Sequence, residues 1–314
     1  MVSLLTIVVM IVAIFVIVKC ADYIIKAISN FSREFGVTEY LLGFVIVAFG
    51  TSIPELSTSI FGSIKGQGNL VIGNLIGAAI LDTTLVLGLM AIVGRNIVIK
   101  GKMFKTFDQA LFVTLAIVIL PLILSFDGML SRFDGILLLV AYAIYLIILI
   151  EREETFKHHK HIVMKNIRKD IIVVLICFPL MLVAAWFLVN SAVSIANELA
   201  ISPFIIGMSI LAIGTTLPEL LVEIRSVHKG RKSVGFGDVL GSLIANVSLI
   251  LGISAIINPI NVGLSSIMMS SLFLVTSTFV ALLFLQKRSV TWKEGMALIL
   301  IYVTFIMSEV IILR

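Results

Sequence analysis

Ten apolar runs, each long enough to cross a bilayer, constrain this chain more than any other feature. A hydrocarbon core of about 30 Å needs roughly 20 helical residues. The chain is 60% hydrophobic and 13% charged, which is about half the share of charge in a soluble domain. Most of its surface must therefore face lipid, and we predict an all-α integral membrane protein with ten transmembrane helices. The predicted spans are 2–28, 39–64, 69–94, 106–125, 133–151, 170–196, 202–227, 234–257, 265–286 and 292–312.

Basic residues mark alternate connections between these spans. Of the 23 Lys and Arg residues, 18 lie at five connections, and the intervening ones carry almost none. By the positive-inside rule these five connections are cytoplasmic, so both termini are expected to be extracellular. The net charge of +5 is thus a topology signal for a multi-pass protein of the cell membrane, and no nucleic acid is expected as a partner.

The two halves of the chain repeat each other at an offset of 164 residues. Residues 43–56 and 207–220 are identical at eight of fourteen positions, including the motifs GTSIPEL and GTTLPEL. Each half holds five spans, an odd number, so the second half enters the membrane from the opposite side. Such inverted-topology repeats are typical of secondary transporters, which bind substrate near the midplane. The predicted organisation is a first repeat at 1–151 with its motif near 43–88, a cytoplasmic linker at 152–169, and a second repeat at 170–314 with its motif near 207–252.

Proline within each motif should disturb its helix. Pro54 removes a backbone donor and clashes with the carbonyl of Gly50, so the second span is predicted to kink or break there. Pro218 repeats the arrangement in the seventh span. The carbonyls of residues such as Ala48 are expected to lose their helical partners, which lipid does not tolerate unless they line a polar cavity.

Acidic and hydroxyl side chains share faces of these helices. Thr51 and Glu55 are spaced i, i+4, and the second half repeats the pair. A set of oxygen ligands without His or Cys favours a hard cation, and its size and flexibility favour calcium. The ligands predicted from the sequence are Glu55, Glu219, Thr51, Thr215, Asp82, Asn246 and Ser242, joined by loose backbone carbonyls.

Charge indicates the mechanism. Each carboxylate near the bilayer centre costs about 2.5–3.5 kcal/mol on insertion scales, and two glutamates match the charge of one divalent ion. Without that ion they must bind sodium ions or protons, so competition for one carboxylate pair predicts antiport. No resident cofactor is expected, and Ca²⁺, with Na⁺ or H⁺, is the predicted cargo.

Four other groups of polar residues receive structural interpretations. Glu223, whose repeat partner is Ser59, is interpreted as a vestibule or helix-end residue. Asp238 is assigned to packing or capping near a helix start. The linker histidines His158, His159 and His161 are interpreted as part of a solvated loop, and Cys20 and Cys177 as neither a disulfide nor a metal site.

The motifs GTSIPEL, GNLIGAAILD, GTTLPEL and GDVLGSLIAN resemble the paired alpha-repeats of the sodium/calcium exchanger family, in particular its compact prokaryotic members. The resemblance covers essentially the whole chain. It implies that Glu55 and Glu219 are the central calcium ligands, and that the first and sixth helices slide across a rigid core. It also implies supporting roles for Thr51 and Thr215, carbonyl ligands from Ala48 and Ala212, and flanking sodium positions at Ser52, Thr216 and Ser242.

Two departures from the family pattern leave the coupling ion open. Ala78 stands where relatives with sodium sites carry serine. Asp82 and Asn246 exchange the usual order of Asn and Asp, which would conserve one central carboxyl group, expected to be protonated when the site is loaded.

Sodium-driven calcium antiport is the leading interpretation, and calcium/proton exchange is the alternative. A cation channel is less consistent with a chain that supplies both halves of its own site, an arrangement compatible with a monomer. A membrane scaffold that transports nothing is a third possibility. The sequence offers no nucleophile–base pair, so an enzyme is not expected.

Overall fold

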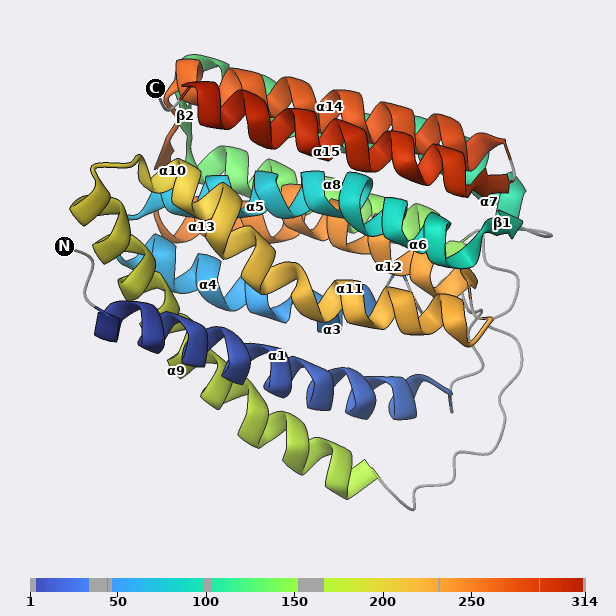
Figure 1. Ribbon diagram of the computed structural model, residues 1–314, viewed down its shortest axis with the longest axis horizontal. Helices are drawn as coiled ribbons and strands as arrows, with labels where there is room; N and C mark the ends of the chain where they lie inside the picture. Colours follow the sequence, from blue (N-terminus) through green and yellow to red (C-terminus); the bar gives the residue numbers. More distant parts are fainter. Residues whose placement is uncertain are drawn as a thin grey trace.

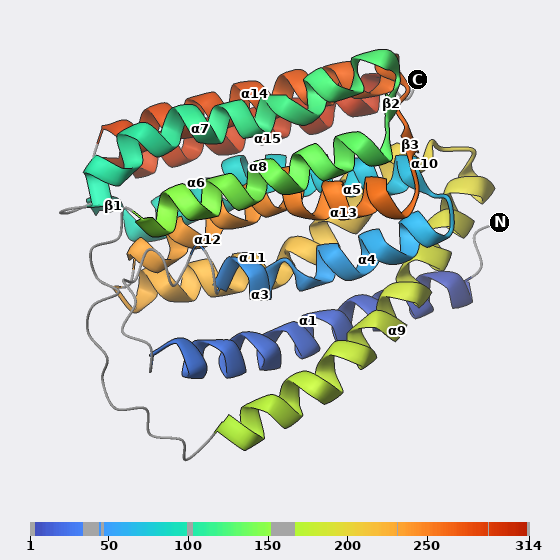
Figure 2. The same cartoon turned by 180° about the vertical axis from the view of Figure 1, so that it is seen from behind.

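The computed structural model describes residues 4–33, 44, 47–98, 103–151, 167–230, 232–287 and 289–312. Its long helices run side by side, and short connections gather at the two ends of the bundle (Figures 1 and 2). Each of the ten predicted spans is occupied by helix. Among the described residues, six helices are long and apolar enough to cross a membrane: Gly68–Gly94, Arg132–Leu149, Ile171–Leu199, Pro203–His228, Lys232–Ile257 and Ile267–Gln286.

The first half contains a broken second span and a third span made of three helical segments. The remaining elements of this half are long helices joined by short strands. In chain order they are α1 (Leu4–Arg33), α3 (Ala48–Thr51), α4 (Ile53–Ile64), α5 (Gly68–Leu81), η2 (Asp82–Val86), α6 (Leu87–Gly94), β1 (Asn96–Val98), α7 (Met103–Leu124), η3 (Ser125–Asp127), β2 (Met129–Leu130) and α8 (Arg132–Glu151).

The second half follows the same order of elements. The offset between the halves is 164 residues from β1 to β3 but 160 residues from α8 to α15. The second half therefore has four fewer residues between β3 and α15 than the first half has between β1 and α8. Its elements are α9 (Ile167–Leu199), α10 (Pro203–Ile206), η5 (Gly207–Leu211), α11 (Ala212–His228), α12 (Lys232–Ile244), η6 (Ala245–Ile250), α13 (Leu251–Ile257), β3 (Ile260–Asn261), α14 (Leu264–Gln286), β4 (Ser289–Thr291) and α15 (Trp292–Ile312).

Two short antiparallel ladders join the halves at opposite ends of the bundle. β1 pairs with β4, and β2 pairs with β3. Basic residues lie where β1 leads toward α7, α11 into α12 and α14 into β4, all at the β1–β4 end, whereas α1 begins and α15 ends at the other end (Figure 1). The described basic connections thus lie on one side, as the alternation along the sequence predicts, and the linker residues 152–166 lie outside the described part of the chain.

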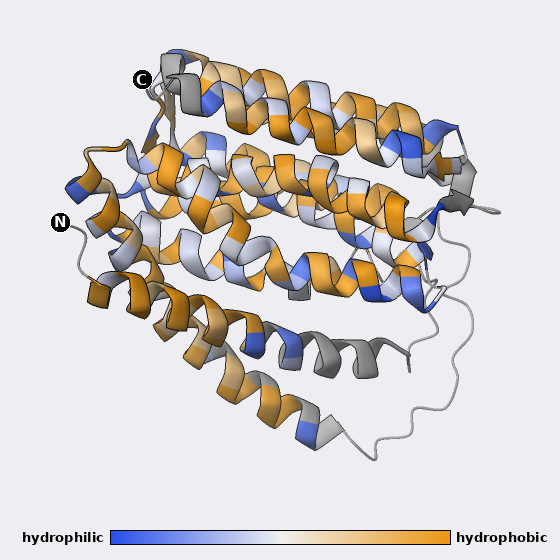
Figure 3. Ribbon diagram, viewed as in Figure 1, coloured by the Kyte–Doolittle hydropathy of each residue, from blue (hydrophilic) through white to orange (hydrophobic). Residues whose placement is uncertain are grey.

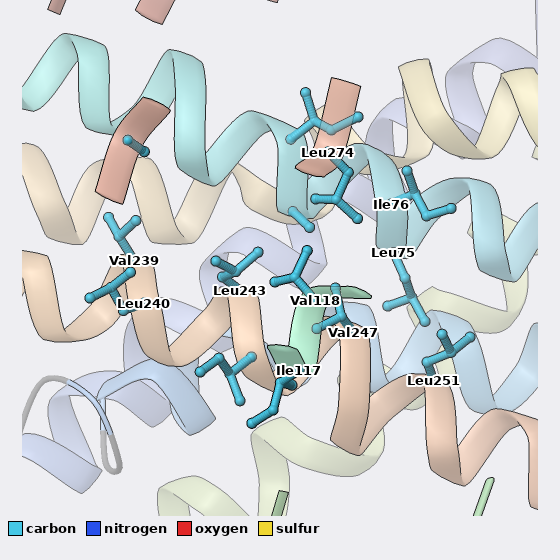
Figure 4. Packing of buried hydrophobic residues seen from close by; sticks show 14 of the residues in the cluster. Leu75, Ile76, Ile117, Val118, Val239, Leu240, Leu243, Val247, Leu251 and Leu274 are labelled. Atoms are coloured by element: carbon cyan, nitrogen blue, oxygen red, sulfur yellow. The ribbon is translucent and has the colours of Figure 1, made fainter. Parts of the chain in front are cut away.

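Apolar side chains cover both the outside and the centre of the bundle. Hydrophobic residues dominate the helices along their length, and hydrophilic ones concentrate at the ends (Figure 3). Large side chains such as Leu4 and Phe112 are each 77% exposed, a pattern suited to lipid. In the centre, residues of α5, α7, α12, α13 and α14 pack against one another, among them Leu75, Val118, Leu243, Leu251 and Leu274 (Figure 4).

Glycines set how closely the central helices cross. A Cβ atom at Gly88 would lie 2.8 Å from the carbonyl oxygen of Gly295, and one at Gly135 would lie 2.7 Å from that of Gly252. These two crossings are repeat-equivalent, and each leaves room only for a hydrogen atom. Small residues allow helix backbones in membranes to approach in this way. The crossings therefore join the first half to the second within a rigid centre.

Helices α1 and α9 form a pair beside this centre (Figures 1 and 2). Their contact is an apolar cluster of its own, which includes Ile17, Ala185 and Leu188. α1 meets α11 through the side chain of Ile14, which lies against Gly214. The pair thus touches its neighbours mainly through apolar side chains, with a hydrogen bond from Lys65 of α4 to Asn190 of α9, whereas the central helices cross backbone to backbone.

Candidate cation site

The first motif breaks its helix, as the proline predicts. α3 ends at Thr51, Ser52 adopts a turn conformation (φ −82°, ψ 5°), and α4 begins at Ile53 with Pro54 in its first turn. Proline is tolerated in a first turn, where its missing N–H would have no helical partner in any case. The break places Glu55 in the first turn of a new helix, where the partial positive charge of the helix N-terminus favours an anion.

The second motif does not break its helix, so of the predicted kink or break the break does not occur there. α11 runs without interruption from Ala212 to His228 with Pro218 inside it. Its irregularity lies one turn earlier, in the π-helical segment η5, where the amide of Ala212 bonds to the carbonyl of Gly207, five residues back. Phe44 and Val47, at the equivalent place in the first half, are π-helical as well, so the π turn is common to both motifs and only the first also breaks its helix.

The prediction that carbonyls near Ala48 and Gly50 lose their helical partners is wrong for Ala48. The carbonyl of Ala48 accepts the amide of Ser52 at 2.9 Å and lies 3.1 Å from the hydroxyl of Thr51. The hydroxyl of Thr215 lies 3.3 Å from the carbonyl of Ala212. Proline deprives only the residue four positions earlier of a donor, and the threonines supply a second donor to their own helices.

Two further π-helical segments lie at repeat-equivalent positions on the neighbouring helices. η2 begins with Asp82, whose carbonyl accepts the amide of Leu87, and η6 contains Asn246, whose carbonyl accepts the amide of Leu251. π turns occur often at functional sites because they reorient side chains within a helix. The sequence analysis did not predict them.

The two motif glutamates are both fully buried. Glu55 and Glu219 have no exposed surface, and each lies within electrostatic range of the other. Thr215 and Thr216 lie close to the Glu55 carboxylate, but neither of its oxygens has a hydrogen-bond partner among the described residues. Buried charge is costly unless it is paired, so this carboxylate requires a proton or a cation.

Hydroxyl groups connect the first motif to the second. Ser52 Oγ donates to Glu219 Oε1 at 3.0 Å and lies 3.2 Å from Ser242 Oγ. Ser242 Oγ in turn lies 3.4 Å from the hydroxyl of Thr51. The second oxygen of Glu219 has no hydrogen-bond partner in the described part of the chain. One carboxylate oxygen is therefore fixed by the protein and the other is available to a ligand.

Asp82 and Asn246 complete the buried polar set. Asp82 lies beside Glu219, and no polar side-chain atom of Asp82 or Asn246 has a hydrogen-bond partner among the described residues. Within those residues, no three His, Cys, Asp or Glu side chains converge as a metal site on their own. A cation here would need hydroxyl, amide, carbonyl or water oxygens as well.

Every site residue predicted from the sequence lies in the interior, at most 3% exposed. The fully buried ones are Thr51, Glu55, Asp82, Ala212, Thr215, Glu219, Ser242 and Asn246, and those with 1–3% exposure are Ala48, Ser52 and Thr216. The three linker histidines lie outside the described residues.

Two acidic residues near the site were assigned other roles from the sequence. Glu223 and Asp238 are fully buried, so neither is a solvated helix-end residue. Asp238 Oδ1 accepts the hydroxyl of Thr51 at 2.9 Å. Both have polar repeat partners, Ser59 and Asn74, and this shared polarity was the signal available in the sequence.

Comparison with known proteins connects this geometry to a family. A model of the family "Sodium/calcium exchanger protein" matches residues 5–151 and 169–309. The chain belongs to the sodium/calcium exchanger family. Its relatives include the inner membrane protein YrbG of Escherichia coli, 31% identical over 80% of this chain and 79% of the relative. They also include the sodium/calcium exchanger MaX1 of Methanosarcina acetivorans, 26% identical over 92% of this chain and 94% of the relative.

A solved structure of an exchanger has the same fold. The sodium-calcium exchanger NCX_Mj, soaked with 2.5 mM Na⁺ and 0.1 mM Ca²⁺, matches with a TM-score of 0.72 at 26% identity, over 97% of this chain and 98% of NCX_Mj. The predicted class, ten transmembrane helices in two inverted five-helix repeats, is confirmed. This member of the sodium/calcium exchanger family is a multi-pass membrane protein and a cation antiporter.

Proposed function

We propose that the chain exchanges Ca²⁺ for Na⁺ at the site between Glu55 and Glu219. The observation that carries the proposal is that these two carboxylates come from repeat-equivalent positions, are fully buried, and lie within electrostatic range of each other. Their combined charge matches one Ca²⁺ ion, whose shell of six to eight oxygens accepts carboxylates, hydroxyls, carbonyls and water. When Ca²⁺ leaves, the carboxylates need monovalent cations, which makes the two fluxes interdependent.

Serine hydroxyls support sodium as the coupling ion. Ser52 and Ser242 lie 3.2 Å apart beside Glu219, and oxygens of this kind suit a hard monovalent cation. A specific observation favours the second candidate, Ca²⁺/H⁺ exchange. Ala78, the repeat partner of Ser242, is fully buried and offers no side-chain oxygen, so a symmetric pair of sodium positions is not formed.

Alternating access would come from the pair α1 and α9. The apolar cluster between them is separate from the central one, and apolar contacts resist sliding less than close backbone crossings do. Because one chain supplies both halves of the site, exchange requires no second copy. The basic end of the bundle is proposed to face the cytoplasm, which places both termini outside.

A flux assay in proteoliposomes tests the proposal. Uptake of radioactive calcium is measured with an outward sodium gradient, with an outward proton gradient, and with neither, at a membrane potential fixed by potassium and valinomycin. We expect the sodium gradient to drive uptake, and Glu55→Gln to abolish it. Uptake with the proton gradient alone would refute sodium coupling. Calcium flux that needs no counter-ion would indicate a channel.

A further inference from the structure

We propose that Glu223 and Asp238 form a second cation site, one helical turn from the central site on the path to the basic end of the bundle. The inference rests on the proposed function, because its ligand is the transported Ca²⁺. It concerns two carboxylates to which neither the antiport mechanism nor the helix packing gives a role.

The geometry brings these residues together from two neighbouring helices. Glu223 follows Glu219 by one turn of α11, and Asp238 precedes Ser242 by one turn of α12. A Cβ atom at Gly235, which lies one turn before Asp238, would be 3.8 Å from the Glu223 carbonyl oxygen. The two helices therefore pack face to face at this level. The acidic neighbours of Glu223 are Asp238, Glu219 and Asp82.

The oxygens of this pair are unpartnered within the protein interior. Glu223 is fully buried, and neither of its carboxylate oxygens has a hydrogen-bond partner among the described residues. Asp238 uses Oδ1 to accept the Thr51 hydroxyl, while Oδ2 likewise lacks a partner there. Three carboxylate oxygens are thus buried without hydrogen-bond partners among those residues, a costly arrangement unless a cation neutralises them.

The repeat-equivalent place in the first half carries no such charge. Asn74 and Ser59 replace Asp238 and Glu223. The Asn74 amide donates to Thr58 Oγ1 at 3.3 Å, and its oxygen lies 3.4 Å from the Thr215 hydroxyl. The Ser59 hydroxyl has no partner among the described residues, but the set carries no charge that would need a cation, so the second cation site exists on one side of the central site only.

The positions of Glu223 on α11 and Asp238 on α12 indicate the role of this second cation site. α11 runs from Glu219 through Glu223 to its end at His228, and α12 begins at Lys232, both at the basic end of the bundle (Figure 1). A cation that moves between the central site and that end passes the pair. Two carboxylates match the charge of one Ca²⁺ ion, with water completing its shell. The site would hold Ca²⁺ on its way to or from the centre.

Equilibrium binding of radioactive calcium to the purified full-length protein tests the proposal. The wild type is expected to show two classes of site. Glu223→Gln combined with Asp238→Asn should lose one class, or weaken it at least about 10–100-fold. Glu55→Gln should weaken the central class and leave the other. Ser59→Ala, at the repeat-equivalent position, is the matched control and should retain both.

Thermal melting of each variant separates loss of a ligand from loss of the fold. A single class of site in the wild type, or complete loss of binding in a folded Glu55→Gln protein, would overturn the second site. Either result leaves the antiport proposal intact if sodium-driven calcium flux persists in the wild type. Conversely, two classes of site without sodium-driven flux would refute sodium coupling and keep the second cation site.

Discussion

The two halves of the molecule carry the same motif on differently organised backbones. In the first half the helix breaks at Ser52 and the nearby amide of Asn74 is paired with hydroxyls. In the second half α11 is continuous, and Asp238 and Glu223 stand where the first half has neutral residues. The inverted repeat thus preserves the two central glutamates but not their surroundings. A transporter needs equivalent ligands at the centre, whereas the approaches from the two sides are free to differ.

Substitution of the central glutamates is the test of equivalence between the halves with the largest expected effect. We expect Glu55→Gln and Glu219→Gln each to lower sodium-driven calcium flux at least about 100-fold, because losing a buried charge partner costs about 3–5 kcal/mol. Proteoliposome uptake measures the loss, with the helix-capping variant Glu294→Gln as control. Near-normal flux in either variant would show that only one half supplies the calcium ligand.

Acidification should weaken calcium binding at this centre. Protons and Ca²⁺ compete for the same carboxylate oxygens, so binding releases protons, and affinity falls as pH falls. The dissociation constant for Ca²⁺ is expected to change about tenfold per pH unit for each proton that Ca²⁺ displaces. Calorimetric titration at several pH values measures it. Equal pH dependence of calcium affinity in Glu55→Gln and Glu219→Gln would support equivalent halves. A calcium affinity that does not change with pH in the wild type would contradict competition.

Glycine contacts test equivalence in packing. A Cβ at Gly77 would lie 2.9 Å from the Cβ of Ala212, and one at Gly241 would lie 2.5 Å from that of Ala48. Gly77→Ala and Gly241→Ala should each destabilise the protein by about 1–3 kcal/mol, the cost of overpacking. Thermal melting in detergent measures the effect. Gly235→Ala, whose one close contact would be the flexible end of Met90, with Ser226 and Glu223 at ordinary contact distance, is the control and should melt close to the wild type.

The hydroxyl of Ser242 is a smaller difference between the halves. Replacing it with alanine removes one hydroxyl contact to Ser52, so Ser242→Ala should raise the sodium concentration for half-maximal exchange about 3–10-fold, as a hydrogen bond is worth about 0.5–1.5 kcal/mol. Ala78→Ser should act in the opposite direction. Sodium-dependent calcium efflux measures both variants. An unchanged sodium dependence in both would favour proton coupling.

Helix caps should show the smallest effect. Asp134 accepts the amide of Ser131 at 2.8 Å, and Glu294 accepts that of Thr291 at 2.7 Å. These caps begin α8 and α15, so Asp134→Ala and Glu294→Ala are each expected to cost about 1 kcal/mol of stability. Thermal melting compares them. Unequal shifts would show that the last helices of the two repeats depend differently on their first turns.

The spans and the central acids could be predicted because each leaves a local mark in the sequence. Runs of about 20 apolar residues have few alternatives to a transmembrane helix, and Pro54 with Glu55 recurs at a fixed offset. The π turns left no such mark. Nor did the motifs reveal that one helix breaks while the other stays continuous. The contacts of Glu223 and Asp238 were not predicted because they lie on another helix, where periodicity along one chain segment gives no information.

The interleaving of the halves has a consequence for biogenesis. α5 packs against α10 and η5, where a Cβ at Gly73 would lie 2.9 Å from the carbonyl carbon of Phe204. A ribosome delivers the first five spans before these partners have been translated. Glu55 and Asp82 must therefore remain at the insertion machinery or near lipid headgroups until the seventh span emerges. The chain therefore completes its assembly late, and chaperones of membrane insertion would bind the first half before its partner helices have been translated.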